Sequence, residues 1–227
     1  MITLECLLEF ETKEDINAIL DLMRRFSSAM RYAYKRLLES KKRKDLKKNI
    51  SILFNINTRY SDDAILLAQS MISLCKERGK NPKKVIFGSR ALFDKLNKKH
   101  LTGKSKENLI REWREKRQGN LYSRGDKSKQ GNLNLRLELS KEDMHLRINT
   151  GNKQYVYAKV IRTVSRKNDK WIDFMLMLLK AKESGSWFPY SVRLTLKNGN
   201  VYAFISVEEK LPPRLVNNFV SHNKISC

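Results

Sequence analysis

The order of its periodic segments constrains the fold of this chain more than any other feature. Residues 2–10 have the largely alternating polarity of a strand, and helical periodicity then continues as far as Gln118. Strand periodicity returns only after Gly131. Because a lone strand needs partners, the first strand is expected to pair with strands beyond residue 131. The sequence therefore predicts an α+β fold, a small antiparallel β-barrel with a helical domain inserted after its first strand.

The predicted helices lie in the inserted domain. The first begins at Thr12, where Asp15 gives a variant of the capping box, and continues to about Ser40. Four more are expected: a segment containing Leu46, Ile50 and Leu53, residues 61–79 with Ser61 as cap and Gly79 as stop, residues 89–100, and residues 105–118. The predicted domains are residues 1–11 (first strand), 12–120 (helical domain), 121–210 (rest of the barrel) and 211–227 (tail).

The second half of the chain has the signals of antiparallel strands. Strands are expected over residues 133–139, 145–150, 154–161, 191–196 and 201–207. Asn198-Gly199, between the last two, is a strong hairpin signal, since both residues tolerate the positive φ angles of a tight turn. The spacing of apolar residues in 169–183 favours a short helix.

Charge is the main indication of a partner. Lys and Arg number 47 against 24 Asp and Glu, which gives a net charge of +23 and an isoelectric point near 10.0. Residues 76–136 carry 19 basic and 6 acidic residues, a net charge of 19 − 6 = +13 in a 61-residue stretch. Hydrophobic residues make up 41% of the chain, which is sufficient for a packed core. A folded protein with this charge is expected to bind polyanions.

The excess of basic over acidic residues is most evident in residues 117–136. The one acid of this segment, Asp126, is outnumbered by five basic residues and interleaved with three glycines. With little that is apolar to bury, the segment is expected to be exposed and able to wrap a polyanion, its glycines allowing backbone N–H groups to approach phosphates. The alternative is a solvated loop between two domains. The five basic residues are Arg117, Arg124, Lys127, Lys129 and Arg136.

Aromatic residues occur beside basic ones at several places, a pattern typical of sites that stack an unpaired base and hold its phosphate. Tyr32, Tyr60 and Tyr122 are candidates for stacking, whereas Tyr34 and Trp113 fall on apolar helical faces and are expected in the core. The candidate nucleic-acid-binding residues are Arg31, Tyr32, Arg59, Tyr60, Lys83, Lys84, Arg90, Arg117, Tyr122, Arg124, Lys127, Lys129 and Arg136.

No cofactor, metal or catalytic site is expected. Phosphate-loop and dinucleotide fingerprints are absent, and the histidines (His100, His145 and His222) and cysteines (Cys6, Cys75 and Cys227) are scattered. Asp62 and Asp63 are interpreted as capping a helix start, and Glu112 and Glu115 as part of a charged helix face. With no signal peptide and no apolar run long enough for a bilayer, a reducing cytoplasmic compartment and no membrane partner are expected.

Several segments together resemble the N-terminal half of TnpB, the OrfB-type proteins of insertion sequences that are related to type V CRISPR effectors. The resemblance covers roughly residues 1–210 and lies in residues 26–37, 57–64, 84–93, 96–103, 112–117 and 122–137. It implies a wedge barrel, similar to an oligonucleotide-binding fold, interrupted by a helical recognition domain. It also implies binding of a structured guide RNA and of target double-stranded DNA, with base pairing supplying sequence identity.

The chain departs from that family where the nuclease would begin. Full-length members continue into a RuvC-like nuclease with catalytic carboxylates and a zinc ribbon, whereas this sequence ends 14 residues after Pro213 without another acid. The expectation is a binding lobe that is not itself an enzyme, with gene truncation favoured over a split protein or an excised fragment. The alternatives are a scaffold that completes a separately encoded nuclease half, a truncated transposase without function, and a nuclease or recombinase that uses Asp62, Asp63, Glu112 and Glu115.

Overall fold

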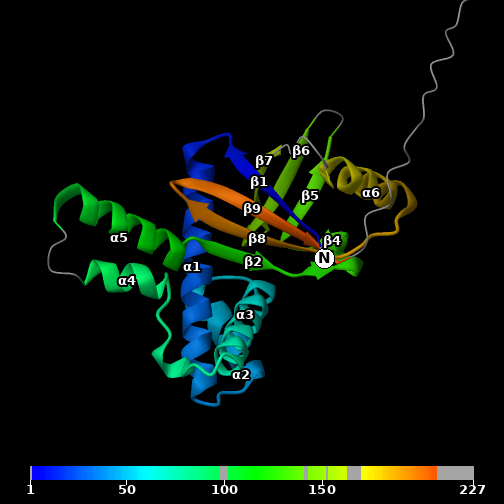
Figure 1. Ribbon diagram of the computed structural model, residues 1–227. Helices are drawn as coiled ribbons and strands as arrows, with labels where there is room; N and C mark the ends of the chain where they lie inside the picture. Colours follow the sequence, from blue (N-terminus) through cyan, green and yellow to red (C-terminus); the bar gives the residue numbers. More distant parts are fainter. Residues whose placement is uncertain (1, 98–101, 141–142, 152, 163–169, 209–227) are drawn as a thin grey trace, which may run out of the picture.

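The first strand lies in the middle of the sheet in the computed structural model. The structure describes residues 2–97, 102–140, 143–151, 153–162 and 170–208. Strand β1 (Ile2–Phe10) pairs antiparallel with β9 (Asn200–Val207) on one side and β7 (Gln154–Arg162) on the other. The whole sheet has seven strands in the order β2-β8-β9-β1-β7-β6-β5 (Figure 1). Its other members are β2 (Asn120–Ser123), β5 (Leu135–Leu139), β6 (Met144–Gly151) and β8 (Tyr190–Lys197). The predicted α+β class and the late partners of the first strand are confirmed.

The helices of the insertion follow β1 directly. Helix α1 (Lys13–Leu38) starts as predicted, because the Thr12 side chain accepts a hydrogen bond from the Asp15 backbone N–H at 3.0 Å. It extends from the sheet to the pair formed by α2 and α3 (Figure 1). The remaining elements of the insertion are α2 (Arg43–Phe54), α3 (Thr58–Glu77), the 3-10 turn η1 (Pro82–Lys84), α4 (Arg90–Leu96) and α5 (Gly103–Gln118).

Two predicted helix boundaries are wrong. Helix α3 begins at Thr58 rather than Ser61, because the Asn57 side chain caps it by accepting from the Tyr60 N–H at 2.8 Å. Asp62 and Asp63 therefore lie beyond the first turn, and the interpretation that they cap the helix is wrong. Helix α4 ends at Leu96, short of the predicted His100. His100, His222, Cys227 and the tail of residues 211–227 fall outside the described residues.

A short two-stranded ribbon, separate from the main sheet, is formed by the residues that connect β2 to β5 in the sequence. It consists of β3 (Gly125–Asp126) and β4 (Gly131–Asn132), joined by the 3-10 turn η2 (Lys127–Lys129). Gly131 has φ +88°, and a Cβ there would lie 2.1 Å from the Tyr190 ring. The side chain of Asn132 is buried with Asn134 next to it. The expectation that residues 117–136 have too little apolar surface to contribute to the core is thus wrong in part, since Leu121, Asn132 and Leu135 are buried although residues 127–130 are exposed.

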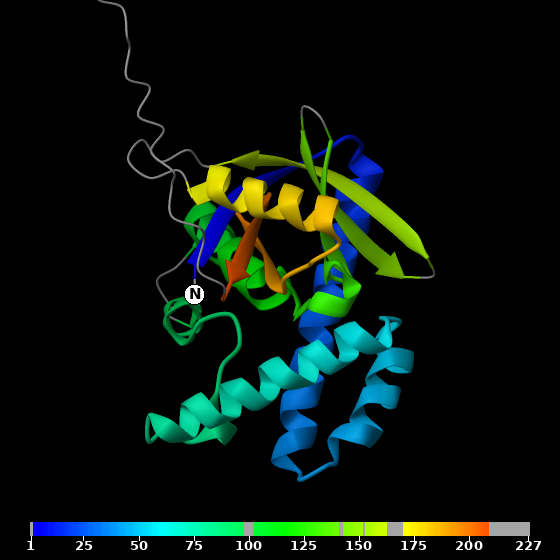
Figure 2. The same ribbon diagram turned by 90° about the vertical axis from the view of Figure 1, so that its right-hand side faces the viewer.

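The remaining helix lies against the sheet. Helix α6 (Lys170–Ser184), as the apolar spacing predicts, crosses one side of the sheet in Figure 2. Its buried Phe174 lies edge-on to Phe188 and Tyr190, with ring centroids 6.0 and 6.2 Å away. The hairpin of β8 and β9 turns at Asn198 and Gly199, both with positive φ, as predicted. None of the helices in the described part of the chain combines the length and apolar character that a bilayer crossing requires.

The thiol of Cys6 provides a test of this packing. Cys6 is buried in β1, and burial raises its pKa from 9.0 to about 12. The thiolate is the reactive form, so at pH 8 its fraction should be lower by roughly 1,000-fold than for a free cysteine. We expect Cys6 to resist iodoacetamide in the folded protein and to react in urea, as read by mass spectrometry of its peptide. Fast labelling of Cys6 without urea would contradict the buried position of β1.

Candidate nucleic-acid interface

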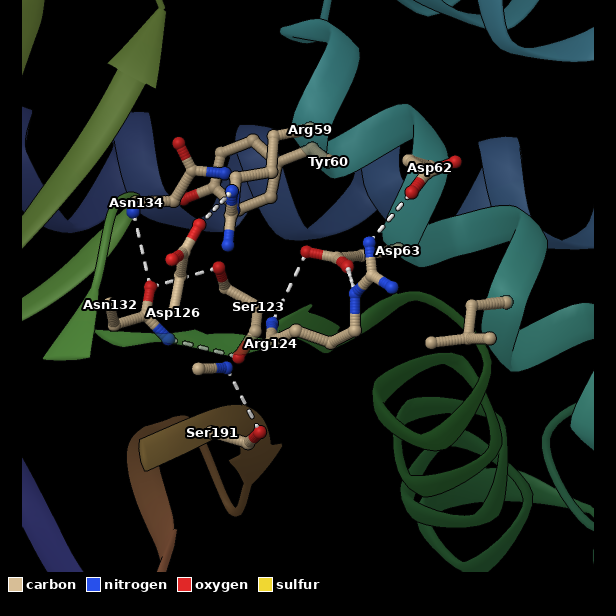
Figure 3. A network of polar contacts seen from close by, with 12 residues as sticks. Arg59, Tyr60, Asp62, Asp63, Ser123, Arg124, Asp126, Asn132, Asn134 and Ser191 are labelled. Carbon is tan, nitrogen blue, oxygen red and sulfur yellow. Dashed lines mark hydrogen bonds and ion pairs between the residues drawn. The ribbon is translucent and has the colours of Figure 1, made fainter. Parts of the chain in front are cut away.

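Arg124 belongs to a network of ion pairs between the ribbon and α3 (Figure 3). The carboxylate of Asp63 is 0% exposed and accepts hydrogen bonds from Arg124 Nε at 2.7 Å and from the Arg124 backbone N–H at 3.2 Å. Arg124 Nη2 also contacts Asp62 at 2.6 Å, and Asp62 receives a second guanidinium from Arg43 at 2.8 Å. Both aspartates therefore fix the ribbon to the helix, and the charge of Arg124 is compensated inside the protein.

Burial and charge act in opposite directions on these two carboxyl groups. Burial raises the pKa of Asp63 above its ordinary value, and the hydrogen bonds from Arg124 offset this only in part. Burial also acts to raise the pKa of Asp62, but the hydrogen bond and charge of Arg43, together with the charges of Lys47 and Arg124, outweigh it and lower that pKa. Asp62 and Asp63 thus differ although they are adjacent, because Asp62 is partly solvated and has two arginine partners.

A second group of predicted residues holds the corner between α5 and β2. Arg31 of α1 donates to the backbone oxygen of Arg117, and Ser27 Oγ donates to the oxygens of Gln118 and Asn120. Burial, followed by the charge of Arg117, lowers the pKa of Arg31 to about 10. The Arg117 guanidinium lies over the Trp113 ring, 5.1 Å from its centroid. Arg31 and Arg117 are thereby brought together, with Arg31 engaged in a structural contact.

The lysines among the predicted binding residues are exposed, and their charges are not compensated by a described residue. Lys83 and Lys84 are exposed in η1, and Lys127 and Lys129 are exposed in η2. None of the four makes an ion pair with a residue that the structure describes. Arg90 is exposed on α4 but is paired with Asp94 at 3.0 Å. These lysines are the predicted residues with the most freely available charge.

The three candidate tyrosines have different environments. Tyr60 is 1% exposed and packs edge-on against Phe26, so it cannot stack on a base, and that prediction is wrong. Tyr32 is half-buried between Phe54 and the guanidinium of Arg36. Tyr122 is half-buried in β2, with Arg193 6.0 Å from its ring centroid. Tyr34 is buried as expected, whereas Trp113 is only half-buried.

Arg59 and Arg136 meet in a pocket where the helical insertion faces the sheet. The pocket has a volume of about 440 Å³ and is also lined by Arg147 of β6 and Tyr155 of β7. Sequence reasoning missed these two residues because the basic clusters that it considered end at residue 136. The signal was present, since residues 144–148 and 155–159 alternate buried apolar residues with polar, basic or aromatic ones. Arg59 is paired with Asp126 at 3.0 Å, and Arg147 with Glu138 at 3.3 Å.

A family model described as SSO2105 N-terminal domain matches residues 1–221. The chain belongs to this family. The matched range spans the sheet, the helical insertion and the three-arginine pocket. A comparison with functionally curated proteins finds no match.

The four carboxylates considered for a nuclease are engaged in separate contacts. Glu112 pairs with Lys116 at 2.7 Å, and Glu115 accepts from the backbone N–H groups of Asn198 and Gly199 at 3.0 Å. Asp62 and Asp63 bind arginines on another element. Within the described ranges no group of three or more His, Cys, Asp or Glu side chains could hold a metal ion. The four carboxylates considered for a nuclease are therefore not brought together with a third ligand to form a metal site.

Proposed function

We propose that this chain is the nucleic-acid-binding lobe of a TnpB-like transposon-encoded protein. It acts in the cytoplasm, binds a structured guide RNA and target double-stranded DNA, and performs no catalysis of its own. The protein contacts sugar-phosphate backbones and duplex shape, while base pairing with the guide supplies sequence identity. The TnpB resemblance implies a wedge barrel with helices inserted after its first strand, and the seven-stranded antiparallel sheet with its helical insertion after β1 supports this. The family description as an N-terminal domain agrees with a lobe that precedes another part in related proteins.

The observation that carries this proposal is uncompensated positive charge on a folded framework. The acids of the basic region are largely engaged by the protein: Asp94, Glu112 and Asp126 in ion pairs, and Glu115 with a backbone turn. The charge of the exposed lysines in η1 and η2 is not compensated in this way by any described residue, so it is available to a partner. Exposed lysines without partners suit phosphates, because an ammonium group keeps its hydration until a phosphate replaces it.

Salt dependence tests this proposal directly. If about eight phosphates are neutralised, the logarithm of the affinity for a hairpin RNA should fall with log salt concentration at a slope of about −6 to −7. Replacing Lys127 and Lys129 by Gln should reduce the steepness of the slope by about 2 and weaken binding, because two phosphate contacts are lost. Fluorescence anisotropy over a salt series measures both quantities.

The matched control removes the same charge elsewhere. Lys13→Gln combined with Lys180→Gln alters two exposed lysines on α1 and α6 and should leave the slope nearly unchanged. Arg124 is left out of this series because its substitution would disturb the fold. A flat salt response of the wild-type protein would exclude the nucleic-acid-binding lobe altogether. Equal effects of the two double variants would instead place the RNA away from the η2 turn.

An exposed face of α6 favours a second function, that of a scaffold for a separately encoded nuclease half. Ile172, Leu176 and Leu179 recur at helical spacing and are all exposed. Such an apolar face on a surface helix is typical of a contact with another protein. Co-purification with a nuclease half, lost in Leu176→Lys but retained in Lys180→Gln, would distinguish this function from that of a solitary binding lobe.

A further inference from the structure

The pocket between α3 and the sheet combines three arginines from distant parts of the sequence. Arg59 comes from the first turn of α3, Arg136 from β5 and Arg147 from β6. The rest of its lining includes Asn134, Asn149 and Tyr155. Among the described residues, the ion pairs of these arginines are those of Arg59 with Asp126 and of Arg147 with Glu138. Arg136 has no ion-pair partner among the described residues, which leaves one positive charge in excess.

The Nε atoms of these arginines lack hydrogen-bond acceptors. In the described part of the chain, six buried side-chain polar atoms have no partner, and three of them are the Nε atoms of Arg59, Arg136 and Arg147. A buried donor without an acceptor costs free energy, so three in one pocket require an explanation. An anion with several oxygens, bound in the pocket, would give acceptors to the guanidinium groups of these arginines.

The position of Arg136 is itself unfavourable without a ligand. Arg136 lies directly opposite Arg147 in the β5–β6 pairing, and like charges at such positions destabilise a sheet. Burial, followed by the charge of Arg147, lowers the pKa of Arg136. A local conflict of this kind in an otherwise consistent fold is typical of a functional site.

Two further features indicate which anion fits. Helix α3 begins at the pocket with Thr58 and Arg59 and has no acid in its first turn, so its dipole favours negative charge there. Tyr155 and Tyr157 of β7 are 42% and 48% exposed. Tyr157 pairs with Arg147 in register, and the Arg147 guanidinium lies 4.7 Å from the Tyr155 ring centroid. Aromatic rings beside guanidinium groups suit a phosphate that is joined to a base.

We infer that Arg59, Arg136 and Arg147 bind a phosphodiester group of an RNA strand, and that a neighbouring unpaired base of this strand rests against Tyr155 or Tyr157. This inference rests on the proposed function and specifies where on the protein the RNA is held. The guanidinium groups contact the phosphate oxygens, and each of these arginines also carries an Nε–H donor that the protein leaves unused.

The test uses a fluorescein-labelled RNA hairpin with a single-stranded tail and the full chain. Arg136→Gln should lower the affinity about tenfold or more, since a hydrogen-bonded charge contact is lost. Arg136→Lys should weaken RNA binding nearly as much as Arg136→Gln. Lysine keeps the positive charge, but it cannot donate two parallel hydrogen bonds to a phosphate as a guanidinium group does. Arg24→Gln, at an exposed arginine of α1 paired with Asp21, should change the affinity less than about twofold. Urea midpoints check that each variant is folded.

A measurement on the wild-type protein keeps the inference testable if the Arg136 variants do not fold. Addition of the RNA should shift the NMR signals of the Nε–H groups of Arg59, Arg136 and Arg147, but not that of Arg24. Wild-type RNA binding with unchanged Arg136 variants or unshifted Nε–H signals would overturn this inference alone. Displacement of the RNA by an equal charge of polyglutamate would overturn it in favour of an acidic peptide. Absence of any RNA binding would remove the proposed function itself.

Discussion

Asn132→Ala should destabilise the protein by about 3–5 kcal/mol, one of the two largest effects that we expect. Asn132 is 0% exposed, and all its side-chain hydrogen-bonding groups are used. Its Oδ1 accepts from the Leu135 N–H at 2.9 Å and also from the side chain of Ser123 and the N–H of Asn134. Its Nδ2 donates to the backbone oxygens of Ser123 and Tyr190 at 3.0 and 3.1 Å. Alanine would leave these groups buried without partners.

Asn132→Asp separates the hydrogen-bonding role from the effect of volume. Aspartate has nearly the same shape, but it replaces the two Nδ2 donors by an acceptor facing two carbonyl oxygens. We therefore expect a loss of stability as large as that of Asn132→Ala, measured by urea denaturation at pH 7. Asn49→Ala, at an exposed position of α2, is the control and should change the free energy of unfolding by less than about 0.5 kcal/mol. A mild effect of Asn132→Asp would contradict this account of the ribbon.

Sequence patterns predicted correctly the helices and strands that have one apolar and one polar face. The alternation in residues 201–207 and the turn at Asn198-Gly199 suffice to place the last hairpin, since both signals are local. The Thr12 cap and the late partners of β1 follow from equally simple rules. The ribbon around Gly131 was missed because its core is polar. Buried Asn and Ser residues have no apolar signature, and their role depends on Tyr190, more than fifty residues away.

The candidate site shows the same limit. The positions of basic residues in the sequence are sufficient to find the exposed lysines of η1 and η2. They do not identify which arginines are compensated, since the partners of Arg124 are distant in sequence. They likewise give no sign that Arg59 meets Arg136 and Arg147 in one pocket. Charge can thus be counted from the sequence, whereas its availability depends on tertiary contacts.

Arg124→Gln is expected to act on stability rather than as the loss of a phosphate contact. It removes the partner of the fully buried Asp63 carboxylate. An uncompensated buried charge is costly, and because the Arg124 side chain is 36% exposed, solvent limits the loss to about 3 kcal/mol. Lys127→Gln, three residues away and exposed, should leave the free energy of unfolding nearly unchanged. Urea denaturation of the two variants gives the comparison.

The pH dependence identifies Asp63 as the cause. Burial already raises the pKa of Asp63, and loss of Arg124 should raise it further above the ordinary value of 3.8. At pH values above this raised pKa, Asp63 is charged in the folded variant, and the variant shows its full loss of stability. As the pH falls from there towards 3.8, the folded protein takes up the proton first, so the loss should shrink. The double variant with Asp63→Asn should be more stable at pH 7 than Arg124→Gln alone, because no buried charge remains. A destabilisation that is independent of pH and of Asp63 would instead assign Arg124 to packing.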